Sequence, residues 1–283
     1  MTDPKRYLLN FGCGAMTHKC WTNVDVCATD PSVYVHDLHQ PFTFEDQSYD
    51  AAYGSHVIEH LEPDAAKRLL VECYRVLKPG GILRVVVPDL EAIARGYLDA
   101  LEQVALDGEQ REGRYDWMML EMFDQLVRTS PGGRMAEYLR RPLGEDMKGF
   151  IAGRIGNEAL LWSEAVGTKR GTPFGIFKRV RNRIWRGIKG LQVFGAQACV
   201  RVLLGEAAAR TFLHGLFRAS GENHLWMYDR FSLRRLLLQA GFTDVNTCTA
   251  FESRIAGFTS FELDVHGNRP RKPDSLYMEG RRG

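Results

Sequence analysis

Tyr7-Leu8-Leu9-Asn10-Phe11-Gly12-Cys13-Gly14 decides the fold, because an apolar run ends there at two glycines one residue apart. This pattern is typical of a buried strand that runs into a tight turn. Gly12 and Gly14 suit such a turn, since glycine adopts a positive φ and leaves room for a ligand close to the backbone. A Gly-x-Gly pair also occurs in purely structural turns, so the function must be argued from the residues that follow.

Downstream of the turn, short apolar runs alternate with polar turns as far as Val87. With the first strand at 7–11, they predict strands over 22–26, 33–36, 49–53 and 82–87. A short helix is expected over 57–61 and a longer one over 64–77, with Lys78-Pro79-Gly80-Gly81 as its stop. Strands joined by helices indicate a parallel α/β sheet, which binds ligands at the carboxyl ends of its strands.

Polar residues follow three of these strands. Asp25 ends the second strand, where a carboxylate can accept both hydroxyls of a ribose. Asp37-Leu38 follows the third strand and suits an adenine, and Gly54-Ser55-His56 follows the fourth, where the reactive end of such a ligand would lie. Each aspartate alone would also suit a helix cap or a turn. Their order along the chain favours one nucleotide-like ligand.

At these residues the sequence resembles class I S-adenosylmethionine-dependent methyltransferases of the type 11-like group. The residues that carry the resemblance are Leu9 to Gly14, Asn23-Val24-Asp25, His36-Asp37-Leu38, Ser48-Tyr49-Asp50, Ser55 to Leu61 and Leu77 to Gly81. It covers residues 7–90 and resumes at about His224, where a helix over 228–240 and strands over 241–249 and 275–279 are expected.

The resemblance implies a Rossmann-like sheet with S-adenosyl-L-methionine as cofactor. Gly12 and Gly14 would face its methionine part, Asp25 its ribose, and Asp37 with Leu38 its adenine. The full set of implied cofactor-binding residues is Phe11, Gly12, Cys13, Gly14, Asp25, Val26, Asp37, Leu38, Gly54 and Ser55.

The sequence departs from that family between the first three strands. Few residues separate Gly14 from the second strand or Asp25 from the third, so the two connecting helices usual in the family must be very short or absent. The third glycine of the longer fingerprint is also missing.

His56-Val57-Ile58-Glu59-His60 matches the inverted zinc-protease motif. That motif belongs on a long helix, whereas this stretch begins at a strand end, so a protease is disfavoured. Small-RNA 2′-O-methyltransferases and some quinone-pathway O-methyltransferases are similar here and hold a divalent ion with more carboxylates. His56 replaces the first carboxylate, which favours a softer ion or none. We therefore expect no metal, with His56, Glu59 and His60 as the alternative site.

Transfer of a methyl group to a hydroxyl requires removal of one proton, and a neutral histidine suits that task. His56 is the first candidate and His224 the second, with Glu59 completing the catalytic set. The alternative is that Glu59 and His60 tie down the helix and His56 alone faces the substrate.

Residues 91–222 interrupt the pattern of the sheet, and 90–106 and 115–127 are expected to be helical. The stretch is too long for a simple connection, so it is interpreted as a helical insertion after the fifth strand that caps the site and selects the substrate. The cofactor domain then comprises 1–90 and 223–283.

Basic residues gather in the insertion. Residues 165–205 contain no Asp or Glu, and they contain nine Lys or Arg: Lys169, Arg170, Lys178, Arg179, Arg181, Arg183, Arg186, Lys189 and Arg201. Apolar residues recur among them at helical spacing, so 169–201 predicts a basic amphipathic helix that contacts an anionic membrane. A solvated basic face is the alternative. Nucleic acid is disfavoured, because no known binding module accompanies the charge.

The composition, 45% hydrophobic and 25% charged with a net charge of +2, is typical of a soluble globular protein. The first residues lack a signal peptide, no window has 18 uninterrupted apolar residues, and the six cysteines form no Cys-x-x-Cys pair. We expect a cytoplasmic protein with reduced thiols, peripheral at the inner membrane if the basic helix binds lipid.

The stretch from Ala250 to Leu276 resembles methyltransferases encoded among bacterial surface-polysaccharide genes. The resemblance implies an O-methyltransferase acting on a saccharide or lipid-linked glycan, with Glu252 and Arg254 either at the substrate or in a salt bridge. A small-molecule natural-product methyltransferase and a non-catalytic membrane-associated protein on the same fold are the alternatives.

Overall fold

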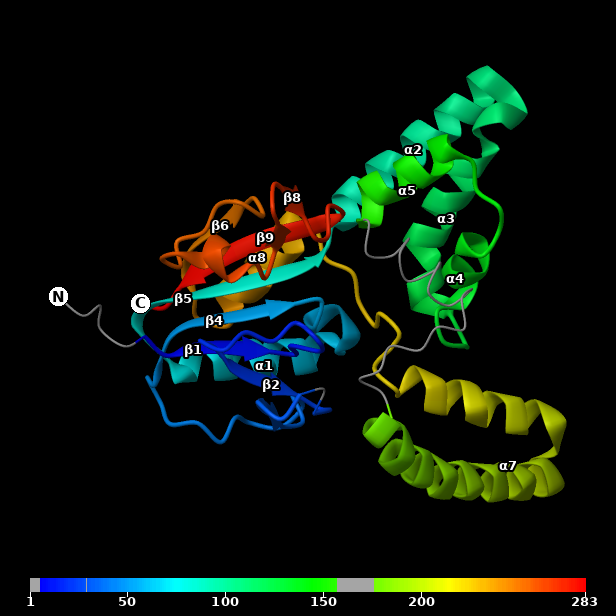
Figure 1. Ribbon diagram of the computed structural model, residues 1–283, viewed down its shortest axis with the longest axis horizontal. Helices are drawn as coiled ribbons and strands as arrows, with labels where there is room; N and C mark the ends of the chain where they lie inside the picture. Colours follow the sequence, from blue (N-terminus) through cyan, green and yellow to red (C-terminus); the bar gives the residue numbers. More distant parts are fainter. Residues whose placement is uncertain (1–5, 29, 157–175) are drawn as a thin grey trace.

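The computed structural model describes residues 6–28, 30–156 and 176–283. Its main sheet has seven strands in the order β3-β2-β1-β4-β5-β9-β6 (Figure 1). Their bounds are Leu8–Phe11 (β1), Thr22–Asp25 (β2), Val33–Val35 (β3), Tyr49–Ser55 (β4), Leu77–Pro88 (β5), Thr243–Cys248 (β6) and Ser275–Arg281 (β9). The strands from β1 to β5 pair in parallel, and β9 is antiparallel to both its neighbours, β5 and β6. The predicted Rossmann-like α/β sheet is confirmed.

Helices α1 (Pro63–Val76) and α8 (Arg230–Gln239) cover one face of this sheet. Leu69 and Leu70 of α1 and Leu233 and Leu237 of α8 are buried in one cluster with every second residue of β5, such as Leu83. This alternation follows from the two-residue period of a strand. The predicted strand over 82–87 lies within β5, and the predicted helix over 64–77 matches α1 except at Leu77.

The boundary between α1 and β5 differs from the prediction. The helix ends at Val76, and Leu77 already has extended backbone angles. Lys78-Pro79-Gly80-Gly81 was expected to be a turn that stops the helix, but it lies within the bounds of β5. The register against β4 shifts between Tyr49 and Ala51, which accommodates this irregular start of the strand.

No long helix of the described residues covers the other face. Among the described residues between β1 and β3 there is no helix, as the short connections predicted. The chain between β6 and β9 packs there instead, through a 3₁₀ helix, η4 (Phe258–Phe261), and a small hairpin of β7 (Val265–His266) and β8 (Arg269–Pro270). Its Phe258 and Leu263 form a cluster with Trp21, Tyr53 and Tyr277. We call residues 249–274 the loop cover.

A buried arginine attaches the loop cover to the sheet. The Arg84 side chain in β5 is fully buried, and its Nε donates to Oδ2 of Asp264 at 2.7 Å. Its Nη1 donates to Oε1 of Glu279 at 3.0 Å, while Nη1 and Nη2 also reach the carbonyl oxygens of Glu252 and Thr249. Tyr53 donates its hydroxyl to the second oxygen of Asp264 at 2.6 Å. Each buried charge thus has a partner, as burial of charge requires.

Between β5 and α8 the chain leaves the sheet and forms helices α2 (Leu90–Asp107), η2 (Gly108–Arg111), α3 (Glu112–Val127), α4 (Gly133–Leu139) and α5 (Glu145–Ile155). These helices have their own core around Ile93, Trp117, Met118 and Ile151. They extend beyond one end of the sheet (Figure 1). We call α2 to α5 the helical insertion, and its first helices lie where the sequence predicted 90–106 and 115–127.

Helix α7 (Ile176–Arg218) is broken at Gly205, whose φ of 89° and ψ of 176° are not helical. Its two arms run back along each other (Figure 1). Of the predicted basic helix over 169–201, residues 169–175 lie outside the described residues. No helix in the described part of the chain is long and apolar enough to cross a membrane.

The two ends of the segment between β5 and α8 lie next to each other. Asp89, directly after β5, forms a β-bridge with Tyr228, and the Leu90 N–H donates to the Tyr228 carbonyl oxygen at 3.0 Å. Asp89 also caps α2 by accepting from the N–H groups of Glu91 and Ala92. The chain therefore leaves the sheet and returns to it at one point.

Candidate active site

The glycine turn lies at the carboxyl end of β1, and both glycines have a positive φ, 63° at Gly12 and 52° at Gly14. A Cβ on Gly12 would lie 2.3 Å from Cγ2 of Val57, so that glycine is required by packing against the segment after β4. A Cβ on Gly14 would meet nothing within 4 Å. Gly14 therefore leaves open space beside the backbone, whereas Gly12 does not.

Asp25 connects the end of β2 to this turn. Its Oδ2 accepts the Gly14 N–H at 2.8 Å, and its Oδ1 accepts the Cys27 N–H at 3.0 Å. A carboxylate oxygen has a second lone pair, so each can also accept a ligand hydroxyl. Val26, the next residue, is 64% exposed. The predicted ribose-binding carboxylate is thus held at the predicted glycine turn.

Asp37 and Leu38 lie further along the sheet edge. Asp37 accepts hydrogen bonds from the backbone N–H and Nδ1 of His39, both at 3.0 Å, and these bonds hold its pKa below the ordinary value. Leu38 packs partly on the helix-covered core. Neither residue lines the cavity at the glycine turn. Asp37 thus makes the local hydrogen bonds of a turn residue, and its role toward an adenine stays a prediction.

A cavity of about 260 Å³ opens at the glycine turn. The turn contributes residues 12–16, and the end of β4 contributes Ser55 and His56. The far wall consists of residues of the loop cover and β9: Leu263, Asp264, Arg271, Lys272 and Tyr277. The sequence analysis missed this wall, because no local motif marks residues that a long connection brings back to the sheet.

Phe11 and Gly54 lie near the ends of β1 and β4, next to residues that line the cavity. Phe11 is completely buried, and a Cβ on Gly54 would lie 2.2 Å from its ring. Cys13 is also buried, and burial raises the pKa of its thiol to about 11. These three predicted cofactor residues therefore shape the strand ends, and a neutral thiol lines the cavity.

His56 has a φ of 54°, a left-handed conformation that is rare for a residue with a side chain. Its N–H donates to the Val86 carbonyl oxygen at 2.8 Å, which fixes the backbone. In the ring, Nε2 lies 2.9 Å from Oγ of Ser275 and Nδ1 lies 3.3 Å from Oε1 of Glu59. Burial holds the pKa of His56 well below its ordinary value, so the ring is neutral at pH 7.

A second cavity of about 260 Å³ adjoins the first. Its walls come from the helical insertion, chiefly Gln125, Arg128, Met135, Ala136, Leu139 and Ile155. His56 and Lys272 line both cavities. His56 thus stands between the cavity at the glycine turn and a cavity whose lining belongs to the insertion.

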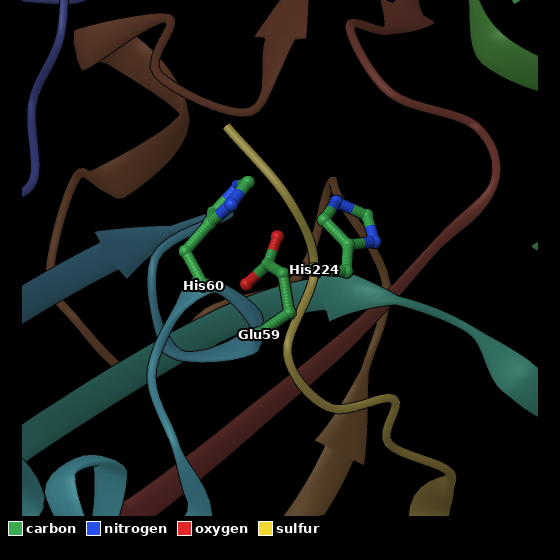
Figure 2. Close-up of side chains that lie close together, drawn as sticks. All are labelled: Glu59, His60 and His224. Carbon is green, nitrogen blue, oxygen red and sulfur yellow. The ribbon is translucent and has the colours of Figure 1, made fainter. Parts of the chain in front are cut away.

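Glu59 and His224 lie behind His56 and line neither of these cavities. Glu59 belongs to the 3₁₀ helix η1 (Ile58–His60), and its carbonyl oxygen accepts the N–H groups of Leu225 and Trp226. Burial raises the pKa of Glu59 to about 8 and lowers that of His224 to about 3. Glu59, His60 and His224 form a compact group (Figure 2). Of the three predicted catalytic residues, the structure thus brings His56 to the cavities.

Residues 9–85 match the family model described as a methyltransferase domain. A search of curated proteins finds no match. Among solved structures, the chain is similar to the [4+2]-cyclase SpnF, with 24% identity, 30% of this chain and 40% of that chain covered, and a TM-score of 0.25.

A methyltransferase from Methanosarcina mazei gives 22% identity over 33% of this chain and 59% of that one, with a TM-score of 0.28. One from Archaeoglobus fulgidus gives 12% identity, coverage of 98% and 86%, and a TM-score of 0.39. The chain spans 40% of the length of the first of these structures and 59% of the second. The domain match and the strand order with an antiparallel β9 carry the assignment. The chain contains a class I S-adenosylmethionine-dependent methyltransferase domain, with S-adenosyl-L-methionine as its cofactor.

Proposed function

We propose that the protein transfers the methyl group of S-adenosylmethionine to an oxygen of an acceptor that enters from the helical insertion. The observation that supports this most is the position of His56, which lines both the cavity at the glycine turn and the cavity of the insertion. A residue between donor and acceptor sites is where such a reaction needs its proton acceptor.

When bound, the cofactor would supply a methyl group on a sulfonium, whose sulfur leaves as a neutral thioether. Gly14 and Asp25 would hold the donor at the turn, and the insertion cavity would orient the acceptor hydroxyl. His56 takes the hydroxyl proton at Nε2, which now contacts Ser275. Glu59, whose Oε1 lies 3.3 Å from Nδ1, orients the ring.

We propose a saccharide hydroxyl, including that of a lipid-linked glycan, as the acceptor. The support is the resemblance of residues 250–276 to glycan-cluster methyltransferases, together with the charged groups Arg128, Lys272 and Asp274 in the insertion cavity, which can bond polar hydroxyls. A phenolic natural product is the second candidate, since Met135, Leu139 and Ile155 give the same cavity an apolar side. An activity screen of nucleotide sugars and lipid-linked glycans against phenols separates the two.

Calorimetry with S-adenosylhomocysteine tests the donor site. Wild type should bind it, and Asp25→Ala should lose most of the affinity because the turn loses its anchor and the ribose its acceptor. His56→Asn should bind like wild type yet lose turnover. Unchanged binding in Asp25→Ala, or full turnover in His56→Asn, contradicts the proposal.

We also propose contact with an anionic membrane through 169–201. The support is the basic composition of that stretch and the three consecutive apolar residues beside the break in α7, Val202, Leu203 and Leu204, which are 72 to 85% exposed. Sedimentation with anionic vesicles should pellet the wild type but not a triple serine variant of these residues. Pelleting without turnover on any acceptor would favour the non-catalytic alternative.

A further inference from the structure

The group formed by Glu59, His60 and His224 is not used in the proposed reaction. One ligand atom from each of these side chains lies within 4.8 Å of the others. In Figure 2 the Glu59 carboxylate lies between the two imidazole rings. The sequence analysis had offered His56, Glu59 and His60 as the alternative metal site, but here His224 from a distant part of the chain takes the place of His56.

Glu59 is the residue that demands an explanation. The whole residue is buried, and neither of its carboxylate oxygens has a hydrogen-bond partner among the described residues. An isolated buried carboxylate is costly unless it is neutralised, paired or bound to a metal. Its Oε1 lies 3.3 Å from Nδ1 of His56, and Lys272 is close enough to act on it by charge.

His60 is arranged as metal-binding histidines usually are. Its Nδ1 lies 3.0 Å from the carbonyl oxygen of Asn223, and an N–H there would donate to that oxygen. This bond fixes the tautomer that leaves the Nε2 lone pair free, and such an outer partner is found for most ligating histidines. The His224 ring stands edge-on to His60, with ring centroids 4.8 Å apart.

The backbone around the group is held by three elements. The Leu225 and Trp226 N–H groups donate to the Glu59 carbonyl oxygen at 2.7 and 3.1 Å. The His224 N–H donates to the Gln125 carbonyl oxygen at the end of α3. Since the backbone of the ligand-bearing segments is fixed in this way, binding of an ion requires movement of the side chains only.

We propose that Glu59, His60 and His224 bind one divalent transition-metal ion. Two imidazole nitrogens and one carboxylate suit zinc, cobalt or iron(II), whereas magnesium and calcium prefer oxygen ligands. Ligand atoms around a tetrahedral ion lie about 3.4 Å apart, given metal–ligand distances of about 2.1 Å, so the three side chains draw together on binding. Three protein ligands leave a position for water on the side of His60, which is half-buried.

The test is metal binding by the full chain after dialysis against a chelator, with neither methyl donor nor acceptor present. Calorimetry with Zn²⁺ and visible absorption with Co²⁺ should show one ion per chain, and Zn²⁺ should raise the melting temperature. Mg²⁺ should neither bind in calorimetry nor raise the melting temperature. Wild-type protein that binds no Zn²⁺ or Co²⁺ overturns the proposal, and this result is independent of methyl transfer.

Variants identify the ligands. His224→Gln and His60→Gln should each lower the Co²⁺ affinity by more than about 100-fold, since loss of an outer partner alone costs about 10- to 100-fold. The exposed control His214→Gln should bind as wild type does. Circular dichroism confirms the fold of each variant, and Glu59→Gln, which keeps the shape of the side chain, replaces any that unfolds. Unchanged binding in a folded ligand variant overturns the proposal.

Discussion

The two faces of the sheet are covered in different ways. On one face α1 and α8 bury an apolar cluster of leucines and valines. On the other, the loop cover packs through aromatic rings and a fully buried arginine. The helical face stabilises the domain, whereas the loop cover also provides a wall of the cavity at the glycine turn, through Leu263, Asp264, Arg271 and Lys272. A face without long helices thus combines core and site.

Replacement of Arg84 should have the largest effect. Arg84→Met removes the charged partner of the buried Asp264 and one of the partners of Glu279, which keeps Arg254 and Ser253. This should lower the free energy of unfolding by roughly 3–5 kcal/mol. S-adenosylhomocysteine affinity should also fall, because Asp264 lines the cavity. Urea unfolding and calorimetry measure the two quantities. The matched control is Arg95→Met, which removes a 72% exposed arginine and should cost below about 1 kcal/mol.

Truncation on the helical face should be comparably destabilising but have no effect on the ligand. Leu69 is 2% exposed in the leucine cluster of α1, so Leu69→Ala should cost about 2–5 kcal/mol. Affinity for S-adenosylhomocysteine, measured at a temperature where the variant is folded, should equal that of wild type. A large loss of affinity would show that the two faces are not separable.

A smaller change probes the bond between β4 and the loop cover. Tyr53→Phe removes only the hydroxyl that donates to Asp264, leaving that oxygen without its partner. The expected loss of stability is about 1–3 kcal/mol. Equal stability of Tyr53→Phe and wild type in urea would mean that Arg84 alone holds Asp264.

A further expected effect is a pH dependence at the end of the loop cover. Burial, and to a lesser degree Glu121, raise the pKa of Asp274 to about 7 despite Arg154 and Lys272 nearby. In the unfolded chain this pKa returns to about 3.9, so between about pH 4 and 7 the folded state binds more protons. This contribution to stability is therefore complete below about pH 4 and decreases as the pH rises towards 7.

Asp274→Asn should remove that part of the dependence. Urea midpoints across this pH range measure it, as the difference between variant and wild type. Parallel curves for the two proteins would contradict the raised pKa.

The sheet could be predicted because its signals are local. Apolar runs, the glycine turn and the helix before Leu77 each depend on neighbouring residues, and their ends fall within a few positions of the observed ones. The short connections around β2 likewise predicted missing helices. The loop cover, which packs on the sheet where those helices would lie, could not be predicted. Its contact between Arg84 and Asp264 joins residues far apart in the chain, and neither residue belongs to a motif.

The difference between local and long-range signals also decides which residues of the candidate site could be predicted. Asp25 and His56 are marked by strand ends, which the sequence reveals. The contact between His224 and Glu59 depends on where the long helical segment between β5 and α8 returns to the sheet. No periodicity in the sequence predicts this position. Gly12 was correctly expected to adopt a positive φ. The sequence did not reveal that Val57 occupies the space that a side chain at this position would need.

The hydrogen bond between Leu90 and Tyr228 joins the two ends of the segment between β5 and α8. A segment whose two ends touch adds no strain to its host and costs only the entropy of closing one loop, which grows slowly with length. The segment between Asp89 and Tyr228 could consequently be replaced by helices of another shape without a change in the sheet. Acceptor choice could then change in evolution, or by engineering, while the donor site remained as it is.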